Sequence, residues 1–161
     1  MRFVVALLVA GAPALVHADC ATDAARMKAQ NTLSLPVGAI EARSALFLRL
    51  CERSGGTLVD GTNPALAGRF EPPDGPKNVL MTDMEYPSWA KKMHLEGTVV
   101  LAFLVDVDGS VHEQTVIQSS GNEAFDRAAL KCWEDARFTH PARLDGRPVP
   151  TLMPVRVRFK I

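Results

Sequence analysis

The chain has 161 residues, of which 47% are hydrophobic and 22% are charged. This composition is typical of a soluble fold, and the length suits one domain with a modest second element. The 18 basic and 18 acidic side chains cancel, which argues against nucleic acid as a partner, because binding a polyanion requires many basic contacts to phosphates.

Residues 1–18 have the pattern of a secretory signal. Arg2 supplies an early positive charge, an apolar run extends from Phe3 to Val16, and small residues lie near Ala18. A permanent membrane span is the alternative, but an apolar helix of this length covers only about 21 Å of a hydrocarbon core of about 30 Å. We therefore expect cleavage after Ala18 and export of the mature chain.

Residues 19–54 predict a small helical hairpin. The first helix is expected at about 22–30 and the second at about 38–53, with Pro36 between them and Gly55-Gly56 after them. The second helix has apolar residues at helical spacing, namely Ile40, Leu46, Phe47, Leu50 and Cys51.

Two of the three cysteines, Cys20 and Cys51, lie at the outer ends of these helices. An antiparallel arrangement would bring them together, and an exported protein folds in an oxidising compartment. We therefore expect a disulfide between Cys20 and Cys51. The alternative is that both remain reduced and simply pack.

Residues 55–76 are interpreted as a linker. The segment has few large apolar residues and would be semi-extended by its prolines. Its glycines and prolines after Gly56 are Gly61, Pro64, Gly68, Pro72, Pro73, Gly75 and Pro76.

Residues 77–161 predict a domain in the order helix, strand, strand, helix, strand. Pro87 can begin a short helix, in which Trp89, Ala90 and Met93 would form an apolar face. The strand at 98–107 is apolar on both alternating sets, which predicts a central strand covered on both faces, and a tight turn is expected at Asp108-Gly109. Asn122 is a candidate cap for a helix with one apolar stripe, formed by Phe125, Ala128, Ala129, Cys132, Trp133 and Ala136.

The last strand has one apolar and one basic face. From Pro154 onward, Val155, Val157, Phe159 and Ile161 alternate with Arg156, Arg158 and Lys160. Pro150 and Pro154 cannot donate ladder hydrogen bonds, which predicts an edge strand. Such an edge can accept an extended peptide as a further strand. The alternative is that the basic row only prevents unwanted pairing.

No catalytic or metal-binding set is apparent. The run Asp106–Gly109 is similar to the start of a calcium loop, but Ile117 occupies the position of the bidentate glutamate. The histidines have no partners at metal-ligand spacing, and Ser119 and Ser120 have no recognisable base. We expect neither an enzyme nor a cofactor, and we interpret Cys132 as a buried thiol, with an intermolecular disulfide as the alternative if it is exposed.

The order of elements and the residues at their joints resemble the C-terminal domain of the TonB family over residues 86–161. These are periplasmic proteins that couple the inner membrane to outer-membrane receptors. The points of match are Tyr86-Pro87, Glu96-Gly97, Asp106–Gly109, Ser119-Ser120-Gly121, Phe125-Asp126, Ala128-Ala129-Leu130, Phe138, Pro141-Ala142, Gly146, Pro148-Val149 and Phe159. The resemblance implies an α+β fold of the order αββαβ, with a three-stranded antiparallel sheet and two helices.

The resemblance also implies a function. In the family, an extended receptor segment called the TonB box adds to the last strand. The implied contact residues are Pro154, Val155, Arg156, Val157, Arg158, Phe159, Lys160, Tyr86 and Pro87. The implied location is the periplasm, or the inner membrane if residues 1–18 are retained.

The chain departs from the family by lacking a long proline-rich arm after a true membrane anchor. Two alternatives therefore stay open: the protein couples to an inner-membrane energising complex, or it is a stand-alone periplasmic adaptor that transduces no energy. A homodimer formed through the exposed strand is a further alternative, because three strands and two short helices make a marginal core.

Overall fold

The computed structural model describes residues 19–75 and 86–161, so the expected signal segment lies outside the described residues. The helices are α1 (Cys20–Gln30), α2 (Val37–Arg53), the 3-10 helix η1 (Pro64–Leu66), α3 (Ser88–Lys92) and α4 (Glu123–Trp133). The strands are β1 (Val59–Asp60), β2 (Phe70–Glu71), β3 (Gly97–Val105), β4 (Val111–Gln118), β5 (Arg143–Leu144), β6 (Arg147–Pro148) and β7 (Thr151–Phe159). The fold is α+β, as expected.

The predicted hairpin is present as α1 and α2. Asp19 caps α1 by accepting a hydrogen bond from the Thr22 N–H at 3.2 Å. Asn31 ends α1 in the left-handed region, at φ 37°, and its amide group holds the turn by donating to the Leu35 carbonyl and accepting from the Leu35 N–H. Beyond this turn, α2 runs back along α1.

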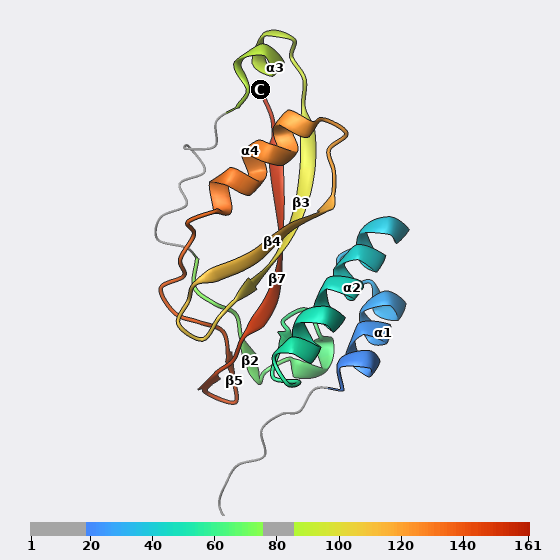
Figure 1. Cartoon of the computed structure of the whole chain (residues 1–161), viewed down its shortest axis with the longest axis vertical. Coiled ribbons are helices and arrows are strands. Elements are labelled where there is room, and N and C mark those ends of the chain that lie inside the picture. Colours follow the sequence, from blue (N-terminus) through green and yellow to red (C-terminus); the bar gives the residue numbers. More distant parts are fainter. Residues whose placement is uncertain (1–18, 76–85) are drawn as a thin grey trace, which may run out of the picture.

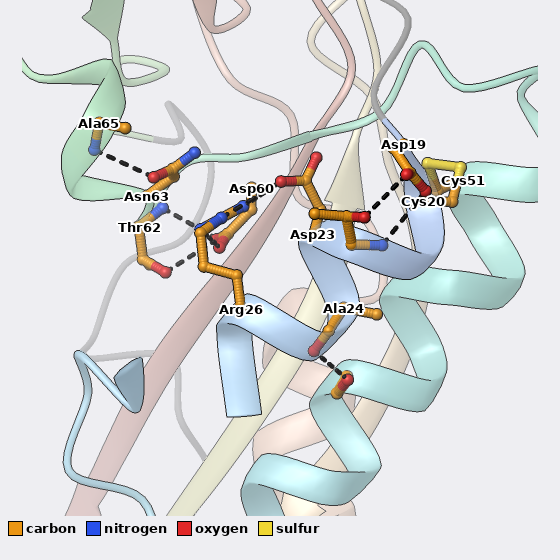
Figure 2. A network of polar contacts seen from close by, with 12 residues as sticks. Asp19, Cys20, Asp23, Ala24, Arg26, Cys51, Asp60, Thr62, Asn63 and Ala65 are labelled. Atoms are coloured by element: carbon orange, nitrogen blue, oxygen red, sulfur yellow. Dashed lines mark hydrogen bonds and ion pairs between the residues drawn. A yellow bond between two sulfur atoms is a disulfide. The ribbon is translucent and has the colours of Figure 1, made fainter. Parts of the chain in front are cut away.

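The expected disulfide joins the two helices. Cys20 and Cys51 are bonded, with their Cα atoms 5.7 Å apart. Figure 2 shows the bond at the first turn of α1, beside the Asp19 cap. The bond closes the open end of the hairpin, opposite the turn at Asn31.

The interpretation of residues 55–76 as a linker is wrong for the described part, which ends at residue 75. β1 pairs in parallel with the start of β7, and β2 pairs with β5. Leu58 and Val59 are buried, so the few apolar residues of the segment are the ones that anchor it. Gly61 and Gly68 lie in turns and Pro64 begins η1, so the segment up to β2 is part of the fold and not a free spacer.

The main sheet has the order β1-β7-β3-β4. β3, β4 and β7 form the expected three-stranded antiparallel sheet, and β1 adds a short parallel strand beside β7. A second, small sheet has the order β2-β5-β6. The central position predicted for β3 is confirmed, because it lies between β7 and β4.

Both faces of β3 are covered by helices, as its two apolar residue sets predict. Figure 1 shows α4 on one side of the sheet and the hairpin of α1 and α2 on the other. Val100 and Ala102 pack into the cluster under the hairpin, whereas Val99, Leu101 and Phe103 pack into the cluster under α4. The molecule therefore has three layers, with the sheet in the middle.

The predicted apolar stripe of α4 lies against the sheet. Phe125, Ala129 and Trp133 are buried, and the Trp133 ring stacks on Phe103 with the ring centroids 4.8 Å apart. Cys132, the thiol outside the disulfide, is half-buried and packs at the margin of the same cluster. The apolar face expected of α3 is wrong in part: Ala90 is buried, but Trp89 and Met93 are 46% and 65% exposed, because five residues make too short a helix to bury a whole face.

A buried ion pair connects the hairpin to β1. Arg43 of α2 donates to an Asp60 carboxylate oxygen at 2.7 Å, and both side chains are at most 2% exposed. Arg26 of α1 approaches the other carboxylate oxygen at 3.4 Å, and Figure 2 shows Asp60 between Arg26 and Thr62. Burial lowers the pKa of Arg43, while Asp60 acts in the opposite direction; the guanidinium stays charged at neutral pH. β1 is thus fixed to both helices by one carboxylate.

Gly109 is held at a backbone conformation and in a space that only glycine fits. Its φ is +82°, and a Cβ atom there would lie 2.4 Å from the Phe138 carbonyl oxygen. The Gly109 carbonyl accepts a hydrogen bond from the Phe138 N–H at 2.8 Å. The predicted turn between β3 and β4 therefore docks on the segment that follows α4.

Gly109→Ala is expected to destabilise the protein by about 1–3 kcal/mol more than Gly121→Ala, which is the matched control. Both glycines have a positive φ, and both alanines would carry the strain of that conformation. Among the described residues, a Cβ atom at Gly121 would have no heavy atom within 4 Å beyond its chain neighbours, whereas a Cβ atom at Gly109 would collide with backbone. Chemical unfolding of the two variants measures the difference, and equal losses would show that the Phe138 contact is not tight.

Candidate functional site

The candidate site is the outer edge of β7. On its inner side, β7 pairs with β3 without interruption, from Gly97 opposite Phe159 to Val105 opposite Thr151. On its outer side, β1 pairs with Thr151 and Leu152. The prediction of an edge strand is therefore wrong for these two residues and right for 153–159, where no strand of the described ranges pairs on that side.

The hydrogen bonds of β1 reveal which backbone groups of β7 face outward. In a strand, the N–H and C=O of one residue point to the same edge of the strand, and those of the next residue point to the opposite edge. The Pro150 carbonyl accepts from the Val59 N–H at 2.9 Å, on the β1 side. Pro154, Arg156 and Arg158 lie an even number of positions after Pro150, so their backbone polar groups point to the same edge as the Pro150 carbonyl. They therefore face outward beyond the end of β1.

This phase explains why a proline is tolerated inside a nine-residue strand. Pro154 lies opposite Ala102 of β3, but its missing N–H would have pointed to the outer edge. The ladder between β7 and β3 loses no bond. The proline therefore marks the outer edge of the strand, as its position in the sequence predicts.

The two faces of β7 differ as predicted. Val157 and Phe159 are buried under α4, whereas Arg156, Arg158 and Lys160 are exposed. Within the described residues, Arg156 and Arg158 form no salt bridge. Other exposed arginines do: Arg53 reaches Glu113 at 2.9 Å, and Arg69 reaches Asp145 at 2.5 Å.

Tyr86 and Pro87 do not lie in this basic row. The Tyr86 ring packs edge-on against Phe125 and Phe159, with the ring centroids 5.5 and 5.8 Å away, and its hydroxyl donates to the Leu95 carbonyl. Desolvation raises the pKa of Tyr86, and Glu96 adds to the effect. Tyr86 therefore packs the α4 side of the sheet at the end of β7, and Pro87 precedes α3.

The carboxylates of the turn between β3 and β4 serve the turn itself. Asp106 accepts from the Val107 N–H at 2.6 Å. Asp108 accepts from the N–H and hydroxyl of Ser110, and these bonds lower the pKa of Asp108. Ser110 also contacts His112 at 2.8 Å, but Asp108 bonds the serine and not the histidine. The arrangement is not that of a nucleophile, a base and a group that orients the base.

The Ser119 and Ser120 side chains likewise form hydrogen bonds within the fold. Both hydroxyls donate to the Asp126 carboxylate at the start of α4. Among residues 19–75 and 86–161, no group of three histidine, cysteine, aspartate or glutamate side chains could hold a metal ion.

The sequence reasoning missed β1 and its partner Arg43. The available signal was a charged residue on the apolar face of α2, three positions after Ile40 and four before Phe47. A charge in such a place is buried only with a partner. Asp60, directly after the apolar pair Leu58-Val59, is the carboxylate that the pattern could have indicated.

Comparisons with known proteins agree on the C-terminal half. Residues 82–161 match the family model described as the Gram-negative bacterial TonB protein C-terminal. Protein TonB of Vibrio cholerae is 38% identical over 76 residues, which are 47% of this chain and 31% of that protein. Protein TonB of Haemophilus influenzae is 36% identical over 78 residues, which are 47% of this chain and 27% of that protein. The chain thus spans less than a third of the length of either relative.

The solution NMR structure of the Pseudomonas aeruginosa TonB CTD superposes with a TM-score of 0.43 at 24% identity, covering 58% of this chain and 88% of that one. The residues that match the family model, 82–161, contain β3, β4, α4 and β7, and therefore include the strand whose edge is the candidate site. The C-terminal half of this chain, residues 82–161, belongs to the TonB C-terminal domain family.

Proposed function

We propose that this protein is a non-enzymatic, TonB-like binding protein that captures extended segments of outer-membrane receptors by strand addition. The observation that carries the proposal is the open outer edge of β7 after Leu152. Five outward groups are available there: the Pro154 carbonyl and the N–H and carbonyl of both Arg156 and Arg158. Main-chain hydrogen bonds contribute about 0.5–1.5 kcal/mol each, so a guest that used all five groups would gain roughly 2.5–7.5 kcal/mol before the cost of ordering.

Arg156→Pro tests strand addition without disturbing the sheet. The substitution removes one outward N–H at the same phase as the natural Pro154, and we expect it to weaken binding about 2- to 12-fold relative to Arg156→Ala. Arg156→Ala is the matched control, because it removes the same side chain and keeps the N–H. Val157 is unsuitable for this test, because its N–H points to β3 and its side chain is buried.

The measurement is fluorescence anisotropy with labelled peptides from the plug segments of outer-membrane receptors. Circular dichroism of both variants checks that the fold is intact. Equal affinities of the proline and alanine variants for every peptide that binds would remove backbone pairing at this edge as the mode of capture.

We further propose a periplasmic location after removal of residues 1–18. The apolar pattern of that segment supports this location. Separately, the described part of the chain, which does not include residues 1–18, contains no helix with the length and apolar character of a membrane span. The intact mass of the protein recovered from the cell envelope tests this: a mass lacking residues 1–18 is expected, and a full-length mass in the membrane fraction would favour an anchored form.

One observation favours the stand-alone adaptor over the energy transducer. Only residues 54–58 separate α2 from β1, and the hairpin packs on the sheet itself. The described residues between the hairpin and the domain thus form part of the fold and not an arm that could reach across a compartment. Loss of receptor-dependent uptake on deletion of the gene would instead support transduction.

A further inference from the structure

We propose that the outer edge of β7 selects a short acidic guest of about seven residues, in which carboxylates alternate with apolar side chains. This inference rests on the proposed strand addition, and it adds the length and the chemistry of the segment that binds. Two independent features carry it: β1 covers the first part of the edge, and two arginines have no ion-pair partner among the residues that the structure describes.

β1 blocks the first part of the edge. It pairs with Thr151 and Leu152, and the Thr151 hydroxyl donates to the Val59 carbonyl at 3.0 Å. Val59 and Asp60 are only 5% and 3% exposed. A guest strand therefore cannot extend past Leu152 without displacing a buried strand.

The ion pair between Asp60 and Arg43 fixes β1 in this place. Displacing β1 would separate the two charges and leave Arg43 buried without its partner, which is strongly unfavourable. Because β7 ends at Phe159, the edge open to a guest is 153–159. These seven residues set the length of the segment that can pair along the whole of the open edge.

The charges on this part of the edge define the chemistry. Arg156 and Arg158 are exposed on one face of β7, and their neighbours on β3 are the uncharged Val100 and Thr98. No carboxylate of the described residues forms a salt bridge with either arginine. Lys160 is not expected to contribute in the same way, because the Glu96 carboxylate lies at that end of the strand and accepts from the Ile161 N–H.

A guest strand has the same two-residue repeat as β7, about 6.6 Å. Carboxylates at positions i and i+2 of the guest would therefore both lie beside an arginine, which binds carboxylates through its planar fork of donors. The intervening side chains of the guest would lie on the α4 side, beside the half-buried Met153 and Val155. The expected guest thus alternates acidic and apolar residues.

Three series of labelled peptides test the inference by fluorescence anisotropy. They alternate valine with glutamate, with lysine or with threonine, and each series has lengths of four, seven and ten residues. We expect the seven-residue glutamate peptide to bind about 2- to 30-fold more tightly than the threonine peptide, from two exposed ion pairs, and the lysine peptide to bind least. Affinity should rise from four to seven residues and change less than about twofold from seven to ten.

Charge reversal provides the second arm. The double variant Arg156→Glu with Arg158→Glu should invert the order of affinities for the three peptides, so that the lysine peptide binds most tightly. The matched control is Arg143→Glu with Arg147→Glu, because these arginines are exposed on the strands β5 and β6, away from the β7 edge, and their reversal should leave the order unchanged.

The outcomes separate this inference from the proposed function. Binding of all three series with equal affinity would overturn the acidic guest while strand addition stands. If the affinity kept rising as the peptides lengthened from seven to ten residues, the inference that β1 limits the length of the guest would be overturned. Absence of binding in every series would remove strand addition and this inference with it.

Discussion

Asp60→Ala is expected to lower the free energy of unfolding by about 3–5 kcal/mol. The Asp60 carboxylate is the partner of Arg43, whose side chain is only 1% exposed, and it also accepts from the Thr62 N–H at 3.0 Å. Removing one member of a buried ion pair leaves the other charge in the interior without compensation. Urea unfolding followed by circular dichroism measures the loss.

The matched control is Asp145→Ala. Asp145 pairs with Arg69 at 2.5 Å, but both side chains are about half exposed, so this pair should contribute less than about 1 kcal/mol. A similar loss in the two variants would show that burial of the Arg43 pair has no special role. Adding Arg43→Met to Asp60→Ala should recover much of the stability, because the unpaired charge is then removed.

Breaking the disulfide between Cys20 and Cys51 is expected to cost about 3–4 kcal/mol. The bond closes a loop with a sequence separation of 31 residues, and cross-links of this size stabilise chiefly by restricting the unfolded chain. Cys20→Ala with Cys51→Ala should lower the unfolding midpoint of the protein at neutral pH.

A reductant supplies the control for this experiment. It should lower the midpoint of the unaltered protein and leave that of the double alanine variant unchanged. An unaltered protein whose midpoint is the same with and without reductant would show that the hairpin does not depend on the bond, and that its packing on the sheet is sufficient.

The sequence predicts well those elements whose signals are local. The strand 97–105 has no polar residue after Thr98, and this pattern requires cover on both faces. The apolar stripe of α4 requires one face on a sheet. Each signal lies within a single element, so neither depends on knowing the partner.

The features that the sequence reasoning missed depend on pairs of residues far apart in the chain. Val59 meets Thr151 across 92 positions, and nothing in residues 55–75 taken alone indicates a strand in parallel with β7. The same limit explains the error over the edge of β7: Pro154 marks an outer edge correctly, but the strand that covers its first residues comes from the N-terminal half.

The exposed Trp89 and Met93 show a second limit. Apolar residues in a short helix are expected to face the interior, but α3 buries only Ala90. Where a five-residue helix places its larger side chains is decided by the chain around it, and the periodicity of five residues is too brief to reveal it.

The pairing of β1 with β7 has a consequence for the order in which the molecule is completed. If the chain is exported as proposed, the N-terminal hairpin enters the oxidising compartment first and its cysteines can join there. The apolar cluster under the hairpin also contains Leu152, so it stays incomplete until the final strand arrives. A truncated chain that stops before residue 151 would therefore retain a cross-linked hairpin whose apolar cluster lacks Leu152 and whose β1 has lost its pairing strand.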